Sequence, residues 1–213
     1  GVISIVTGVP TFSLALGIPK LAPHANPRHV IQAGYVIMAA ALAIMAFSVT
    51  INSSNAFGVY LGAFVAGVGA GTVSSHSSNV VALAVSERDA SQSGGIQSTM
   101  RNVGQAIGVA LLGAVLLLGI TGQVRTGAAA DPAISPEVSQ QVSQMSINLG
   151  SNKEFRDQIA DIDMTESERT ALVNIEARAR YESTRVAYGV GAAIILLGLL
   201  TTPAIKTFDK SEG

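Results

Sequence analysis

Long apolar runs dominate the chain, and few charged residues occur before residue 121. No acidic residue precedes Glu87. A helix needs about 20 apolar residues to cross the hydrocarbon core of a bilayer, and each run is about that long or longer. Helices of soluble domains normally carry a charged outer face, which these runs lack. The pattern therefore predicts five membrane-spanning helices, at residues 1–22, 30–50, 56–84, 92–121 and 186–205.

The connection at 122–185 is polar and contains signals for two helices. Ser135 precedes a proline and then Glu137, which is the order of an N-cap, a first helical residue and an acid near the helix dipole. Thr165 and Glu168 have the spacing of a capping box. They predict a helix that begins at about residue 166 and runs unbroken into the last span. Its thin apolar stripe comprises Leu172, Ile175 and Ala179, and its charged residues indicate a solvated face.

Basic residues in or beside the short connections predict the orientation of the chain. Lys or Arg accompanies the connections at 21–29 and 85–91 and the tail at 206–213, whereas the connection at 51–55 is uncharged. The three basic segments are therefore expected in the cytoplasm, the C-terminus included. Because one membrane span separates the cytoplasmic connection at 85–91 from residues 122–185, the latter are expected outside.

Composition narrows the classes of function. The chain is 48% hydrophobic and 13% charged, and its formal net charge of −1 provides no basic surface for a nucleic acid. It has no cysteine and only three scattered histidines, so we expect no metal site. We also expect no cofactor and no enzymatic activity, because glycines at 67, 69 and 71 lack a dinucleotide motif and no carboxylate accompanies His76 in its span. The chain begins at Gly1 without methionine, which indicates a start inside a larger protein.

The predicted helix at 56–84 carries two stripes of small and polar residues, separated by roughly 100° of helical rotation. The first stripe fits close helix packing, and the second is expected to face a bundle interior or a water-filled cavity because lipid would be costly for it. His76 is then either a titrating group or a hydrogen-bonded packing residue. The first stripe comprises Gly67, Gly71, Ser74 and Ser78. The second, which is the candidate substrate pathway, comprises Thr72, Ser75, His76 and Asn79.

The span at 92–121 opens with a polar segment that contains Arg101, Asn102 and Gln105. Arg101 shares a face with Gly104 and Gly108, which would allow another helix to approach closely. Arg101 can snorkel to the cytoplasmic headgroups or can lock the cytoplasmic ends of helices together. We favour the lock, because an arginine that faces lipid needs no close-packed glycines beside it.

The segment Ser98–Ala110 reads STMRNVGQAIGVA. It resembles a helix of the drug:proton antiporters of the major facilitator superfamily, in the fourteen-span branch, where an Arg-Gln-x-Gly-Gly-Ala-x-Gly-Val-Ala pattern recurs. Asn102 and Gln105 depart from that pattern. In the loop at 20–29, only Arg28 fits the basic pattern that is frequent in the family. The likeness covers nearly the whole chain and corresponds to spans ten to fourteen.

The resemblance implies an all-α membrane protein whose five transmembrane helices form part of the C-terminal half of a major-facilitator fold, with a partly helical external loop. It implies the carboxy-terminal portion of a proton-driven multidrug exporter of a bacterial inner membrane. The expected partners are membrane lipid, the missing N-terminal half, a small amphipathic substrate and protons. Two alternatives stay open: an exporter of a siderophore or metabolite on the same fold, and a structural membrane protein without a transport cycle.

Overall fold

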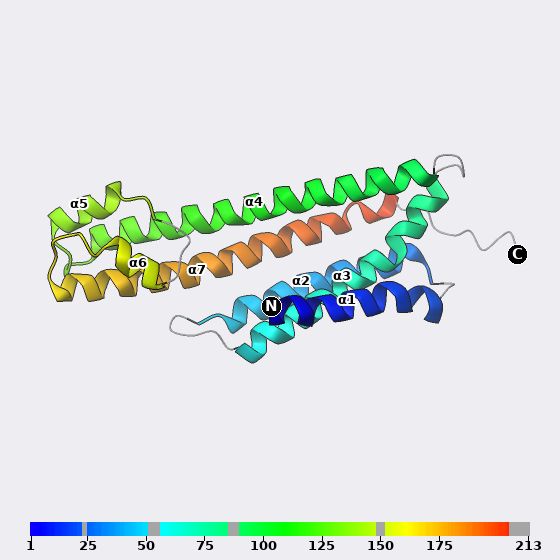
Figure 1. Cartoon of the computed structure of the whole chain (residues 1–213), viewed down its shortest axis with the longest axis horizontal. Helices are drawn as coiled ribbons and strands as arrows, with labels where there is room; N and C mark the ends of the chain where they lie inside the picture. The colour runs from blue at the N-terminus through cyan, green and yellow to red at the C-terminus, as the bar shows by residue number, and fades with distance from the viewer. Residues whose placement is uncertain (23–24, 51–55, 85–89, 148–151, 205–213) are drawn as a thin grey trace, which may run out of the picture. The chain divides into compact units, whose positions relative to one another are not determined.

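The computed structural model describes residues 1–22, 25–50, 56–84, 90–147 and 152–204; within these ranges the side chains at 78, 79, 81–84, 90, 91 and 152 are not described. The described part is all-helical and contains no β-strand (Figure 1). Its elements are α1 (Val2–Leu21), α2 (Pro27–Ser48), α3 (Ala56–Ala84), α4 (Ala90–Ala130), α5 (Pro136–Gln144), α6 (Asn152–Gln158), α7 (Glu166–Leu199) and the 3₁₀ helix η1 (Thr202–Ala204).

Five of these helices are long and apolar enough to cross a membrane: α1, α2, α3, α4 and α7. This composition is compatible with a multi-pass membrane protein. With 41 residues, α4 is about 60 Å long, roughly twice the thickness of a hydrocarbon core. It continues to Ala130, past the predicted span at 92–121. Helix α7 has 34 residues and runs without interruption through the predicted span up to Leu199.

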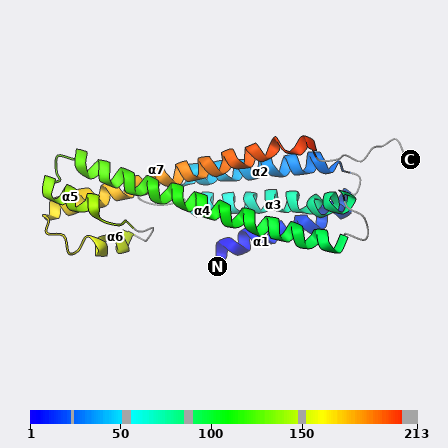
Figure 2. The same cartoon turned by 90° about the horizontal axis from the view of Figure 1, so that it is seen from above.

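The residues divide into two compact units, each of which we describe by itself. The first contains α1, α2, α3, the part of α4 up to Gly108 and the end of α7 from Tyr188. Within it, α3 packs against both α1 and α2, as the two perpendicular views show (Figures 1 and 2). The helix η1 also contacts α2, because Gln32 Nε2 donates a hydrogen bond of 2.8 Å to Thr202 Oγ1.

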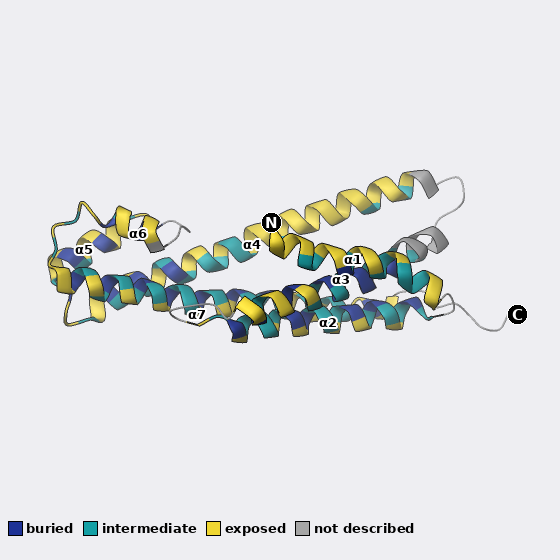
Figure 3. Ribbon diagram, turned by 60° about the horizontal axis from the view of Figure 1, so that its bottom comes forward, coloured by how far each residue is buried: buried dark blue, intermediate teal, exposed yellow. Residues whose placement is uncertain are grey.

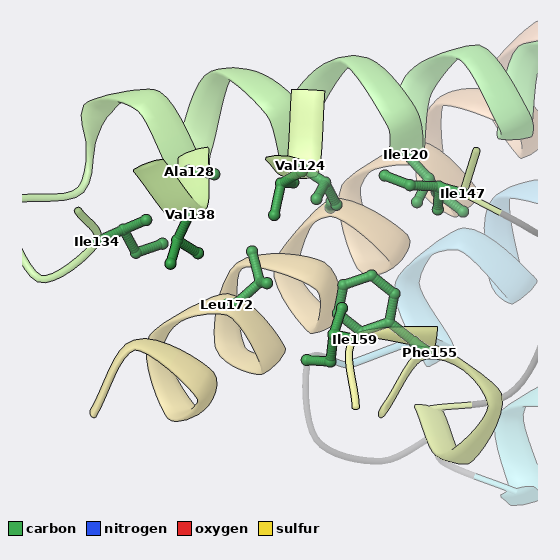
Figure 4. Packing of buried hydrophobic residues seen from close by; sticks show 11 residues of the cluster. Ile120, Val124, Ala128, Ile134, Val138, Ile147, Phe155, Ile159 and Leu172 are labelled. Carbon is green, nitrogen blue, oxygen red and sulfur yellow. The ribbon is translucent and has the colours of Figure 1, made fainter. Parts of the chain in front are cut away.

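The second unit contains the segment Val109–Ala187, which is called the lobe below. In it, α5 and α6 lie against the second half of α4 and the first part of α7, and apolar side chains from all four helices meet in one core (Figure 4). A buried apolar cluster of this kind is what allows a small helical unit to be stable in water. Its buried members are Ile120, Val124, Ala128, Ile134, Val138, Val142, Ile147, Phe155, Ile159, Leu172 and Ala179.

Two helix starts in the lobe agree with the sequence signals. Ser135 is the N-cap residue of α5, and Pro136 is its first residue. Helix α7 begins at Glu166, immediately after Thr165. Helix α6 was not predicted, because its residues are largely charged or polar; its first acid is Glu154.

Candidate functional site

The polar stripe of α3 is buried in the first unit. Thr72, Ser75 and His76 are 8%, 6% and 3% exposed. Thr72 Oγ1 donates a hydrogen bond of 2.8 Å to Val68 O, and Ser75 Oγ donates one of 2.6 Å to Thr72 O. Ser75 Oγ and His76 Nδ1 lie 3.0 Å apart at hydrogen-bond distance. The two hydroxyls therefore have acceptors on their own helix. The predicted fourth member, Asn79, has a side chain outside the described residues, as does Ser78 of the glycine stripe.

Gly67 and Gly71 bring α3 into close contact with α1. A Cβ added at Gly67 would lie 2.2 Å from Thr7 O, and one added at Gly71 would lie 2.6 Å from Thr11 O. Both distances are too short for any side chain larger than hydrogen. A hydrogen bond crosses the same interface, because Thr11 Oγ1 donates to Gly67 O at 3.0 Å. The glycine stripe thus works as a helix-packing surface within this chain.

A second glycine surface of α3, which the sequence reasoning missed, packs against α2. A Cβ at Gly69 would lie 2.8 Å from Met38 N, and one at Gly34 of α2 would lie 3.0 Å from Gly69 O. At Gly62 the clash would be with Met45 Cγ at 2.5 Å. Gly62 and Gly69 are seven residues apart, which is close to two helical turns. This spacing could have predicted the second glycine surface.

Helical rotation relates the polar stripe to these two surfaces. At about 100° per residue, His76 lies within about 20° of Gly69, on the side of α2, and Ser75 lies within about 40° of Gly71, on the side of α1. The polar residues therefore extend from one packing surface to the other. Among α1, α2 and α3, the described part of α3 is the most thoroughly buried (Figure 3).

The predicted cytoplasmic lock on α4 is exposed. Arg101, Asn102 and Gln105 are all exposed, and a Cβ added at Gly104 or Gly108 would meet nothing within 4 Å (Figure 3). No helix in the described part of the chain covers this face. The interaction of Arg101 with a partner helix therefore stays a prediction. Instead, the glycines of α4 that make close contacts lie in the lobe, as described below.

Glu168 joins the starts of two helices in the lobe. Its Oε2 accepts hydrogen bonds from Thr165 N at 2.8 Å and from Thr165 Oγ1 at 2.7 Å, and the Glu168 N–H donates to Thr165 Oγ1 at 3.3 Å, which completes the predicted capping box. Its Oε1 accepts from Ser135 Oγ at 2.6 Å and from Ser135 N at 3.0 Å. The hydrogen bonds from Ser135 and Thr165 stabilise the carboxylate and lower the pKa of Glu168 to about 2.

A charged pair also lies in the lobe, on α7 outside the apolar part of that helix. Glu176 is fully buried, with a side chain that is 1% exposed, and it pairs with Arg180, whose side chain is 29% exposed. Among the residues that the structure describes, Glu176 Oε2 and Arg180 Nε find no hydrogen-bond partner. On the lobe surface, a cavity of about 340 Å³ is lined by Arg156 of α6 and Arg169 of α7 among others. Arg169 is already engaged, because its Nη1 donates to Ile159 O at 3.3 Å.

These arrangements offer packing, hydrogen bonding and charge pairing, and the described part of the chain gathers no group of three or more His, Asp or Glu residues that could hold a metal ion. Comparisons of the chain with protein-family models, with curated proteins and with solved structures found no match.

Proposed function

We propose that this chain is the carboxy-terminal portion of a proton-driven exporter of small amphipathic compounds, built on a major-facilitator fold in a bacterial inner membrane. The complete protein would work by alternating access, in which two helical halves rock about a site near the middle of the membrane. Residues 122–185 would lie outside and the C-terminus in the cytoplasm.

The observation that carries this proposal is the uncovered face of α4. It bears Arg101, Gly104 and Gly108, which belong to the segment that resembles the antiporter helix, and the described part of the chain leaves them all without a covering helix. An arginine and two glycines are a poor surface to present to lipid, because charge is costly there and glycine provides little apolar contact. A second helical half that packs on this face would resolve the conflict.

The polar stripe of α3 is weaker support. Thr72, Ser75 and His76 sit in a helix that otherwise contains apolar and small residues, as a substrate or proton pathway would require. However, they are buried between packing surfaces of this chain, and the hydroxyls of Thr72 and Ser75 are satisfied locally. That burial favours a second candidate function, a structural membrane protein that has no transport cycle.

The test is export by the complete transporter. Everted membrane vesicles that contain it should accumulate ethidium, an amphipathic cation, when the interior is acidified. Arg101→Ala should reduce accumulation severely while membrane abundance stays near that of the parent. Arg101→Lys should restore only part of it, because an ammonium cannot reproduce the planar, multi-donor guanidinium. Arg178→Ala, which changes an exposed arginine of the lobe, is the matched control.

Two outcomes would contradict the proposal. Full export by Arg101→Ala would make this residue a snorkelling anchor. Absence of any proton-dependent transport by the complete protein would favour the structural alternative. Accessibility separates the two interpretations of the α3 stripe. Asn79→Cys should react with a water-soluble thiol reagent when the cytoplasmic side is open, and Ala63→Cys, at a buried position of the same helix, should not.

A further inference from the structure

In the lobe, α4 and α7 approach each other more closely than ordinary side chains permit. A Cβ added at Gly119 would lie 2.6 Å from Ser183 Oγ, and one added at Gly127 would lie 2.6 Å from Ile175 Cγ2. Between these two points, Gln123 Nε2 donates a hydrogen bond of 3.2 Å to Ser183 Oγ. Gly119, Gln123 and Gly127 are spaced four residues apart, so they form one stripe of α4.

The face of α7 that meets this stripe is buried along its whole length in the lobe. Its positions recur every three or four residues, which is the spacing of a single helix face. The buried residues of this face are Glu168, Leu172, Glu176, Ala179, Ser183 and Ala187. The contacts of Gly119 with Ser183 and of Gly127 with Ile175 are eight residues apart on each helix, so the contact between α4 and α7 extends over about two turns.

Other elements of the lobe hold the pair in place. Glu168 attaches the start of α5 to the start of α7 through both carboxylate oxygens. Val138 of α5 and Phe155 of α6 are buried in the same core as Leu172 of α7 (Figure 4). Opening the α4–α7 pair would expose this core to water, so the lobe resists separation of the two helices.

Both helices leave the lobe without a break. Helix α4 is continuous from Ala90 to Ala130 and α7 from Glu166 to Leu199, so each is at once a predicted membrane span and a part of the lobe core. A continuous helix transmits the position of one end to the other much better than a flexible loop does. The lobe therefore has the means to control how the last two spans are paired where they leave the membrane.

We propose that the lobe is a permanent clasp, which keeps the lobe ends of α4 and α7 paired throughout the transport cycle. The reference to a transport cycle rests on the proposed function. The two spans would then move as one body, and alternating access would come from movement of this body against other helices. A connection that opened and closed with each cycle would need the α4–α7 contacts to break.

Cysteine pairs provide the test, because the chain has no cysteine of its own. A Cβ at position 127 would lie 3.7 Å from Ile175 Cβ, which is within the roughly 3.5–4.5 Å that a disulfide requires. In Gly127→Cys/Ile175→Cys the clashing Ile175 methyl is also removed. The control is Gly122→Cys/Ile175→Cys, because a Cβ at Gly122 meets nothing within 4 Å.

The first measurement uses the 213-residue chain in native membranes. Brief oxidation with copper phenanthroline should crosslink Gly127→Cys/Ile175→Cys nearly completely and should leave the control pair mostly free. Crosslinking of the control to the same extent, or failure of the first pair to crosslink in protein that is correctly inserted, would overturn the clasp whether or not the chain belongs to an exporter.

The second measurement uses the complete transporter with the same cysteine pair. Ethidium export should be the same within about twofold before oxidation, after oxidation and after reduction. Loss of export on oxidation that is reversed by reductant would show that the pair must open, and would overturn the proposal. If the parent itself exports nothing while the crosslink still forms, the proposed function fails and the pairing of α4 with α7 stands.

Discussion

Replacing Gly67 by alanine should separate α1 from α3. The added Cβ would lie 2.2 Å from Thr7 O and 2.7 Å from Pro10 Cγ, whereas carbon contacts are comfortable at about 3.5 Å. Relief needs a shift of about 1 Å between two helix backbones, and overpacking of this kind costs about 1–3 kcal/mol. The shift also strains the hydrogen bond from Thr11 Oγ1 to Gly67 O, and a hydrogen bond between membrane helices contributes about 0.6 kcal/mol. The two contributions together give an expected loss of about 1.5–3.5 kcal/mol in the free energy of helix association.

The assay is reversible unfolding of the chain by SDS in mixed micelles, followed by energy transfer between dyes on cysteines introduced at Leu16 and Phe64, which are both exposed. The control is Gly104→Ala, because its Cβ meets nothing within 4 Å and alanine favours a helix over glycine by about 1 kcal/mol. It should leave the midpoint unchanged or raise it slightly. Equal midpoints for Gly67→Ala and Gly104→Ala would refute the packing argument.

Three further predictions concern the lobe. Arg180→Leu should destabilise the lobe by about 3–5 kcal/mol in thermal unfolding, because the substitution leaves the buried carboxylate of Glu176 unpaired. Glu176→Leu should cost less, because Arg180 reaches solvent. The double variant should recover most of the stability that Arg180→Leu loses. The pKa of Glu168 is lowered from 4.5 to about 2, so its contribution should be complete above pH 4.5 and disappear as the pH falls to about 2. Limited proteolysis against pH should show this slope for the parent and not for Glu168→Gln. Ser139→Cys in the loop at 122–185 should react with impermeant maleimide from outside, and labelling from the cytoplasm alone would reverse the topology.

The sequence was most informative where one local rule decides the structure. Scarcity of charge predicted the apolar helices, and the spacing of Thr165 and Glu168 predicted the start of α7, because a capping box is complete within four residues. Leu172 and Ala179 are buried as the apolar stripe predicted. Gly67 likewise lies in a close helix contact, since only small residues allow one.

What the sequence did not reveal depends on tertiary packing. Phe155 and Ile159 are single apolar residues in a polar stretch, and they become core residues only because α6 folds onto α7. The predicted span ended at residue 121, yet α4 continues to Ala130. In this extension Arg125 is exposed, and its Nη2 donates a hydrogen bond of 3.3 Å to Met145 O. Glu176 looked like part of a solvated face and is buried instead.

The distribution of close contacts indicates where a further helical half would bind. Helix α3 has both of its glycine surfaces occupied, Gly67 by α1 and Gly69 by α2, so it offers little room for another helix there. Helix α4 uses Gly119 and Gly127 in the lobe and leaves Gly104 open beside Arg101. The open surface carries Arg101, a charge that lipid disfavours, so under the proposed function a partner half would gain most by covering the first part of α4. We therefore predict that the partner half of the proposed exporter docks on the face of α4 that contains Arg101.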